Sequence, residues 1–407
     1  MALRYYRNPE RLFFIFVFLF FLFGLIKAPC AWCIGNIHFG SLEVHPFLSI
    51  NEGYVDNVYL RPDGDPNLTI KSSSFRSYTS GLRCDWNKIK YRIKLDYTFQ
   101  SFEYDVRDIE DKNLYELDSA FNLKFGKSGH GLDLDGGYRY RKTSDPYTSE
   151  DRTEVHKDTI ASFGFRINMR DRIGIGVNSR MDQLRYVDNS LALRRDRDIF
   201  RISPKFVIKP FTKTGILLEY QYSSNEYRER NYAESPDSET HGALTGLEWE
   251  ATEKLSGAIK AGYQWRDYDD PNRTLTRSPE TWKVEVDLTQ TFSEFTSLKL
   301  NLERRIEDTD YQDGGQAAQY FYSNQVELGL DHQLTYKVGT WIDFSYILSD
   351  YNNSDREDHI WQFDLGFDYQ FLDWIWGHFD YNARIRESNV IFDYQNSQFN
   401  IGLNLVF

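Results

Sequence analysis

The segment "IKYRIKLDYTF" (residues 89–99) alternates almost without error between apolar and polar side chains. The apolar or aromatic positions are Ile89, Tyr91, Ile93, Leu95, Tyr97 and Phe99, and the polar positions are Lys90, Arg92, Lys94, Asp96 and Thr98. A period of two predicts a β-strand whose side chains point alternately to opposite faces. A soluble sandwich would place core on one face and water on the other, whereas a membrane barrel would place lipid outside and water inside. The rest of the chain has to decide between these two folds.

The composition favours the barrel. The chain has 407 residues, and 16% of them are aromatic, yet the mean hydropathy is −0.59. A wall in which only every second residue must be apolar combines many aromatic residues with a polar average. The net charge of −13 opposes nucleic-acid binding, which needs a basic surface.

The N-terminus predicts export from the cytoplasm. Three arginines precede an apolar run over residues 12–26, and "KAPCAWC" (27–33) then offers small residues for cleavage. This pattern is typical of a secretory signal peptide, here residues 1–33, with cleavage among residues 30–33. The mature chain, 34–407, holds no other run long and apolar enough for a transmembrane helix, so it would have to cross a membrane with strands. If cleavage follows Cys33, Cys84 is the only cysteine left, which rules out an internal disulfide and a CxxC metal site.

Alternation recurs along the whole mature chain and predicts about 18 strands, an even number as in single-chain outer-membrane barrels. The expected ranges are 41–51, 73–84, 89–104, 114–125, 131–141, 157–169, 173–185, 198–208, 214–227, 239–250, 256–267, 280–291, 297–307, 319–331, 337–349, 358–371, 375–387 and 395–407. The fold class is therefore all-β, a transmembrane antiparallel β-barrel of the outer-membrane type.

The connections and the tryptophans support this fold. Tight turns such as "RDR" (170–172) alternate with longer polar loops such as 52–72, 142–156, 186–197 and 224–238, which is typical of periplasmic turns and outer loops. Tryptophans fall near both ends of the predicted strands, where an aromatic girdle meets the lipid headgroups: Trp86, Trp249, Trp265, Trp282, Trp361 and Trp374. The last strand ends on Phe407 and resembles the C-terminal signal that the outer-membrane assembly machinery recognises. We therefore expect Ile89 and its apolar partners to face lipid, and Lys90, Arg92 and Lys94 to face a wet lumen in a bacterial outer membrane.

The segment "VHPFLSINEGYVDNVYL" (44–60) resembles the opening of the "putative beta-barrel porin 2" family, a group that includes outer-membrane barrels of exopolysaccharide operons. The residues that carry the resemblance are Pro46, Ser49, Tyr54, Asp56, Asn57 and Val58. The resemblance implies a barrel that exports a polymer across the outer membrane. It brings no catalytic residues and no cofactor.

Charged residues at the predicted inward positions are the candidate site. Around 18 strands enclose a water-filled channel, and a moving polymer needs weak, repeated contacts along it. The predicted path is lined by Lys90, Arg92, Lys94, Arg139, Arg141, Arg166, Arg180, Arg201, Asp364, Asp368, Asp380 and Arg384. The alternative interpretation of each charge is an ion pair that only neutralises the lumen. Two inward tryptophans, Trp341 and Trp376, interrupt the polar pattern and are candidates for stacking on sugars.

Two functions remain open: polysaccharide export together with periplasmic export proteins, and a general or substrate-selective diffusion porin. An enzyme is not expected. The eight histidines form no HExxH spacing, and no GxSxG or phosphate-binding loop occurs. The nearest pair is His378 with Asp380 on one face of a strand. Acid-rich loops match no EF-hand, so no metal site and no cofactor are predicted.

Overall fold

The computed structural model describes residues 37–61, 71–106, 111–127, 130–147, 152–169, 172–211, 213–229, 237–249, 254–269, 278–308, 312–313, 316–317, 320–352, 354–390 and 393–407. The predicted signal peptide, residues 1–33, lies outside these ranges. Among the residues described, no helix has the length and apolar character needed to cross a membrane.

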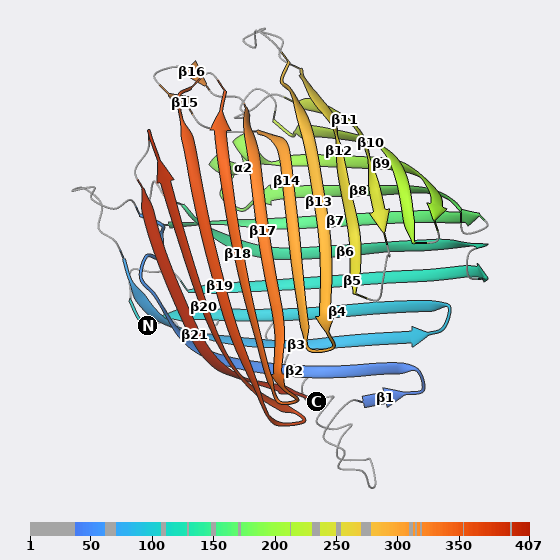
Figure 1. Ribbon diagram of the computed structural model, residues 1–407. Helices are drawn as coiled ribbons and strands as arrows, with labels where there is room; N and C mark the ends of the chain where they lie inside the picture. Colours follow the sequence, from blue (N-terminus) through green and yellow to red (C-terminus); the bar gives the residue numbers. More distant parts are fainter. Residues whose placement is uncertain are drawn as a thin grey trace.

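Eighteen antiparallel strands form one closed barrel, as the alternation predicted. Each strand pairs with the next in sequence, and the last strand returns to pair with the first from Phe47↔Val406 to Val55↔Gln398. In Figure 1 the orange and red strands of the C-terminal half cross in front of the blue and green strands of the N-terminal half.

The barrel strands of the first half are β2 (Leu42–Val55), β3 (Ser73–Lys88), β4 (Tyr91–Tyr104), β5 (Lys112–Lys127), β6 (His130–Tyr147), β7 (Arg152–Met169), β8 (Ile173–Tyr186), β9 (Arg197–Phe211) and β10 (Thr214–Tyr227). Those of the second half are β11 (Ser238–Trp249), β12 (Leu255–Tyr268), β13 (Glu280–Ser293), β14 (Thr296–Asp308), β17 (Tyr320–Thr335), β18 (Val338–Tyr351), β19 (Glu357–Leu372), β20 (Ile375–Ser388) and β21 (Tyr394–Val406). Three short strands and a helix are additional to these eighteen: β1 (Ile37–Phe39), which pairs with the start of β2, and β15 (Gln312–Asp313), β16 (Gln316–Ala317) and α2 (Asn189–Arg195), which are not part of the barrel sheet.

All eighteen predicted strands are present, but three local predictions were wrong. The strand predicted from Ile89 begins at Tyr91, so Ile89 and Lys90 lie in the turn after β3, and Ile89 is 99% exposed. The predicted loop 142–156 is mostly strand, because β6 and β7 continue to pair as far as Tyr147↔Arg152. The predicted loop 186–197 contains helix α2.

The outer face of the wall is apolar. Leu95 on β4, Phe363 on β19 and Ile401 on β21 are 43%, 39% and 61% exposed, although each is surrounded by paired strands. In a membrane barrel such side chains are covered by lipid tails, so exposure of large apolar residues marks the lipid face. Buried side chains are often small and polar instead, such as Ser77 and Ser323.

Aromatic residues lie at both ends of this apolar band, as predicted. Trp86 and Trp374 lie at the end of the short turns, and Trp282 and Trp361 lie toward the long loops. The rings of Trp374 and the terminal Phe407 stack with centroids 6.0 Å apart. These two levels fit the lipid headgroup regions of a bilayer.

The segment after β2 makes hydrogen bonds across the seam between β2 and β21, where the barrel closes. Asn57 is 2% exposed, and its Nδ2 donates to the carbonyls of Arg61 at 2.8 Å and Gln395 at 3.0 Å. The backbone N–H of Ser397 donates to Oδ1 of Asp56 at 2.6 Å. Asp56 and Asn57, which carry part of the family resemblance, therefore tie the start of the first outer loop to β21 on the other side of the seam.

Candidate functional site

The inner wall carries the charged side chains of alternate positions. On β4, for example, Leu95 lies on the exposed outer face and Lys94 on the opposite face. Side chains on the same strand, on neighbouring strands and on next-neighbouring strands meet on this inner face and form ion pairs.

The strands from β3 to β9 form an arginine-rich wall. Arg92 Nη2 lies 2.8 Å from Asp85 Oδ2, near the periplasmic turns. Arg139 contacts Asp118 at 2.5 Å and Glu116 at 3.1 Å. Each of these arginines thus has an acidic partner on a neighbouring strand.

The ion pairs of this wall continue toward the outer end and around the barrel. Arg141 Nε lies 2.7 Å from Asp158 Oδ2. Arg180 lies 2.7 Å from Asp182, which also pairs with Arg201. The arginines stay about half exposed to the lumen, so their pairing is labile and screened by salt.

Four of the predicted residues stand apart from these pairs. Lys94, Arg166 and Arg384 lie on inward positions of strands but have no ion-pair partner within 4 Å among the residues that the structure describes, and the Nε atom of Arg384 is buried without a hydrogen bond there. Lys90 lies in a turn, so it is placed at the rim and not on the wall.

The strands from β17 to β20 form an acid-rich wall. Asp343 and Asp364 are direct cross-strand partners on β18 and β19. Asp364 accepts hydrogen bonds from Gln362 at 2.9 Å and from Asn382. Two acids facing each other give this wall a negative potential.

Asp368 and Asp380 lie on the same wall beside His378. The Nε2 atom of His378 is 4.0 Å from Asp380 Oδ2, and His378 is the cross-strand partner of Asp368. No group of three or more His, Cys, Asp or Glu residues in the described ranges is arranged to hold a metal ion.

The two walls face each other across the lumen. In the closed order of strands, β17 lies halfway around the barrel from β6, and β19 lies halfway around from β8. The positions of β6 and β17 in Figure 1, one behind and one in front, show this arrangement. Arginines on one side and carboxylates on the other set up an electric field across the channel.

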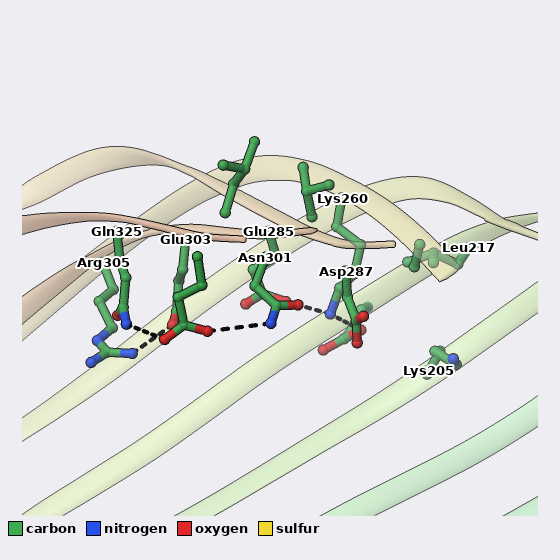
Figure 2. A pocket seen from close by; sticks show the side chains of 14 residues that line it. Lys205, Leu217, Lys260, Glu285, Asp287, Asn301, Glu303, Arg305 and Gln325 are labelled. Atoms are coloured by element: carbon green, nitrogen blue, oxygen red, sulfur yellow. Dashed lines mark hydrogen bonds and ion pairs between the residues drawn. The ribbon is translucent and has the colours of Figure 1, made fainter. Parts of the chain in front are cut away.

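A third group of charged residues lies between the arginine-rich wall and the acid-rich wall, on strands β9 to β17. These residues surround a cavity of about 620 Å³ (Figure 2). Lys260 on β12 lies 3.2 Å from Glu219 on β10 and also pairs with Glu285 on β13. Arg305 lies 2.5 Å from Glu303, and both project into the same cavity. Lys260 and Arg305 were missed as candidates, although they occupy the same alternating inward positions as the predicted ones.

The outer end of β14 is not paired with its neighbour β13. The two strands pair from Glu285↔Glu303 down to the turn, whereas residues 304–308 pair only with β17. Arg266 on β12 donates through Nη2 to the carbonyl of Ile306 at 2.8 Å, and Ile306 is 1% exposed. The end of β14 therefore leans over the inner face of β12 and β13.

Asp308 at the tip of this strand joins three strands inside the outer mouth. It pairs with Arg266, accepts from Tyr268 Oη at 2.9 Å and accepts from Asn225 Nδ2 at 2.7 Å. Both members of the Arg266–Asp308 pair are nearly buried, with 11% and 12% of their side chains exposed. This cluster lies inside the outer end of the barrel, on the side of β10 to β14.

The fold and the charged lumen define a porin-type channel of the bacterial outer membrane. The chain belongs to the "Putative beta-barrel porin 2" family, whose model matches residues 35–407. The resemblance noted at residues 44–60 is thus confirmed. A comparison with curated proteins found no match.

Several solved structures are similar in fold. OccAB4 of Acinetobacter baumannii matches with a TM-score of 0.45 and 8% identity, over 89% of this chain and 98% of that chain. The outer membrane protein opdK of Pseudomonas aeruginosa matches with a TM-score of 0.45 and 7% identity, over 89% and 99%. The ferric enterobactin receptor PfeA of the same organism, in a mutant form, matches with a TM-score of 0.41 and 8% identity, over 89% and 80%.

Proposed function

We propose that this barrel is a channel for the export of an exopolysaccharide across the outer membrane. The observation that carries the proposal is the series of charged and polar groups along the inner wall, from Arg92 and Asp85 near the turns to Arg141 and Asp158 nearer the loops. Such a series offers a long chain a contact at each height of the lumen.

The pairing of these charges suits a moving polymer. A channel needs sites that bind well enough for entry and weakly enough for release. An arginine that already has an acid beside it, such as Arg139 with Asp118, offers hydrogen bonds to a sugar or a carboxylate without holding it strongly. Export by a barrel of this kind would require periplasmic export proteins to deliver the polymer.

The family relationship supports a transport function. The resemblance at residues 44–60 implies a role in exopolysaccharide operons, and a porin-type family suggests a non-enzymatic channel. The pair that the sequence singles out, His378 and Asp380, is 4.0 Å apart and forms part of the lumen wall.

A deletion strain tests the proposal. Removal of the gene should leave polymer in the periplasm and lower its amount in the medium, and a plasmid copy of the full chain should restore secretion. Unchanged secretion together with slower uptake of small solutes would instead identify a diffusion porin.

A further inference from the structure

A tryptophan interrupts the acid-rich wall near its periplasmic end. Trp341 lies on β18 at an inward position, between the outward Ile342 and the turn that joins β17 to β18. Its cross-strand partners are Asp331 on β17 and Gly366 on β19. A large apolar ring on the polar face of a barrel lumen needs an explanation other than contact with lipid.

The neighbouring glycine makes room for the indole ring. A methyl group at Gly366 would collide with Nε1, Cε2 and Cζ2 of Trp341. Only glycine at this position leaves room for the ring, so the indole of Trp341 lies against the backbone of β19 on the lumen side of the wall.

A cavity of about 330 Å³ lies beside this ring. It is bounded by the β13–β14 turn and by the periplasmic ends of β17, β18 and β19, and its polar lining includes Ser297, Asp331, Gln333, Thr340 and Asp368. Asp331 is paired with Lys299 at 2.9 Å. Asp368 has no cation within 4 Å in the described part of the chain, so its carboxylate is available as an acceptor.

A flat ring beside carboxylate, hydroxyl and amide groups fits the chemistry of a sugar unit. The apolar face of a pyranose can pack on an aromatic ring while its hydroxyls donate to the surrounding oxygens. The nearby carboxylates repel an acidic sugar and attract a cation, and the indole face also attracts a cation. The site therefore matches a neutral or amino sugar better than a uronate.

We propose that Trp341, supported by Gly366, is a stacking platform for neutral or amino sugar units at the periplasmic entrance of the lumen. The proposal rests on the export function and names a substrate class for it. It places the first contact of the polymer at the acid-rich wall, with the arginine-rich wall opposite.

Direct binding to the purified full-length barrel tests this platform. The measurement is saturation-transfer NMR with neutral, amino and uronate oligosaccharides in a detergent that has no sugar headgroup. We expect binding of the neutral and amino sugars, about tenfold weaker binding for Trp341→Ala, and a similar loss for Gly366→Val, which displaces the ring. Trp361→Ala is the matched control, because Trp361 lies on the outer, lipid-facing side of β19 and is 39% exposed there, and it should bind within about twofold of the unchanged protein.

Two results would overturn the platform: Trp341→Ala that binds as tightly as the unchanged protein, or uronates that bind as well as neutral sugars. Heat-modifiable migration of each variant shows that it has folded, and Trp341→Ala suffices if Gly366→Val does not fold. Secretion in the deletion strain is measured separately. Lost secretion with normal sugar binding by Trp341→Ala would refute the platform and leave the export function standing.

Discussion

Arg180 and Arg201 are direct cross-strand partners on β8 and β9, and Asp182 pairs with both of them. Two like charges opposite each other on a sheet repel, so the carboxylate between them is what allows both to face the lumen. Asp182 is the more buried of the three, with 17% of its side chain exposed against 50% for Arg180 and 44% for Arg201. The arginine-rich wall thus depends on a small number of shared acids.

Replacing Asp182 should change ion selectivity more than stability. In Asp182→Asn the two guanidinium groups lose their shared carboxylate, so the lumen should become more selective for anions, while the free energy of unfolding falls by about 1 kcal/mol or less. Planar-bilayer reversal potentials provide the measurement. Glu52→Gln removes the same charge from the outer face, where Glu52 pairs with Arg76 at 3.1 Å, and should leave the selectivity unchanged. Equal shifts in both variants would contradict the assignment of faces.

The lipid and lumen faces can be compared at two adjacent residues. Leu95→Arg places a charge on the lipid face near the middle of β4 and should cost on the order of 2–4 kcal/mol of folding free energy. Lys94→Glu alters the charge on the lumen face one residue away and should leave folding nearly intact. Urea titration of folding into lipid vesicles measures both variants. Similar destabilisation by the two substitutions would show that the faces are assigned wrongly.

The stability of the barrel at the seam between β2 and β21 should depend on Asn57. Its side chain makes two donor contacts and accepts from the backbone N–H of Arg61 at 2.7 Å. Asn57→Ala leaves buried backbone groups without partners and should lower the free energy of unfolding by about 1–3 kcal/mol. Asn389 also bonds to loop backbone but is exposed, and Asn389→Ala should change the free energy of unfolding by about 0.5 kcal/mol or less. A smaller loss at Asn57 than at Asn389 would refute the role of Asn57 at the seam.

The stability of the barrel and the conductance of its outer mouth should both depend on Asp308. Asp308→Ala leaves Arg266 buried without its acid and should destabilise the barrel by about 3–5 kcal/mol. The inturned end of β14 should then be released, which raises the single-channel conductance. The exposed pair Lys299–Asp331, with 56% and 52% of the side chains exposed, is the control, and Asp331→Ala should cost about 1 kcal/mol or less. An unchanged conductance in Asp308→Ala would show that this cluster does not narrow the path.

Most of the fold could be predicted from the sequence because a barrel wall repeats one simple pattern. Each strand must be apolar on its outer face and polar on its inner face, so the period of two is visible in every strand and the facing of Leu95 and Lys94 follows from it. The ends of the strands were harder to predict. Above and below the bilayer no lipid selects apolar side chains, so nothing in the alternation shows that β6 continues to Tyr147 or that β4 starts at Tyr91 instead of Ile89.

The candidate site could be predicted only in part, because contacts between strands depend on register. Alternation places Arg180 and Arg201 on the inner face, but it does not show that they are partners or that they share Asp182. The same limit applies to Trp341, whose position over Gly366 follows from the alignment of β18 with β19. The inturned end of β14 was not recognised either, although Arg304 and Asp308 place charges at positions that are apolar in the rest of that strand.

The measurement that tests the export channel most directly combines conductance with secretion in one variant. Arg92, Arg139 and Arg141 are all changed to Glu, in a barrel whose assembly is verified by heat-modifiable migration. Because the three guanidinium groups are 49%, 44% and 42% exposed to the lumen, we expect selectivity to shift toward cations. For a polymer that carries acidic units beside the neutral or amino units that contact Trp341, secretion should fall in a graded, salt-dependent manner. Changed selectivity with unchanged secretion would contradict export and leave a diffusion porin, and no change in either would show that these side chains do not line an open path.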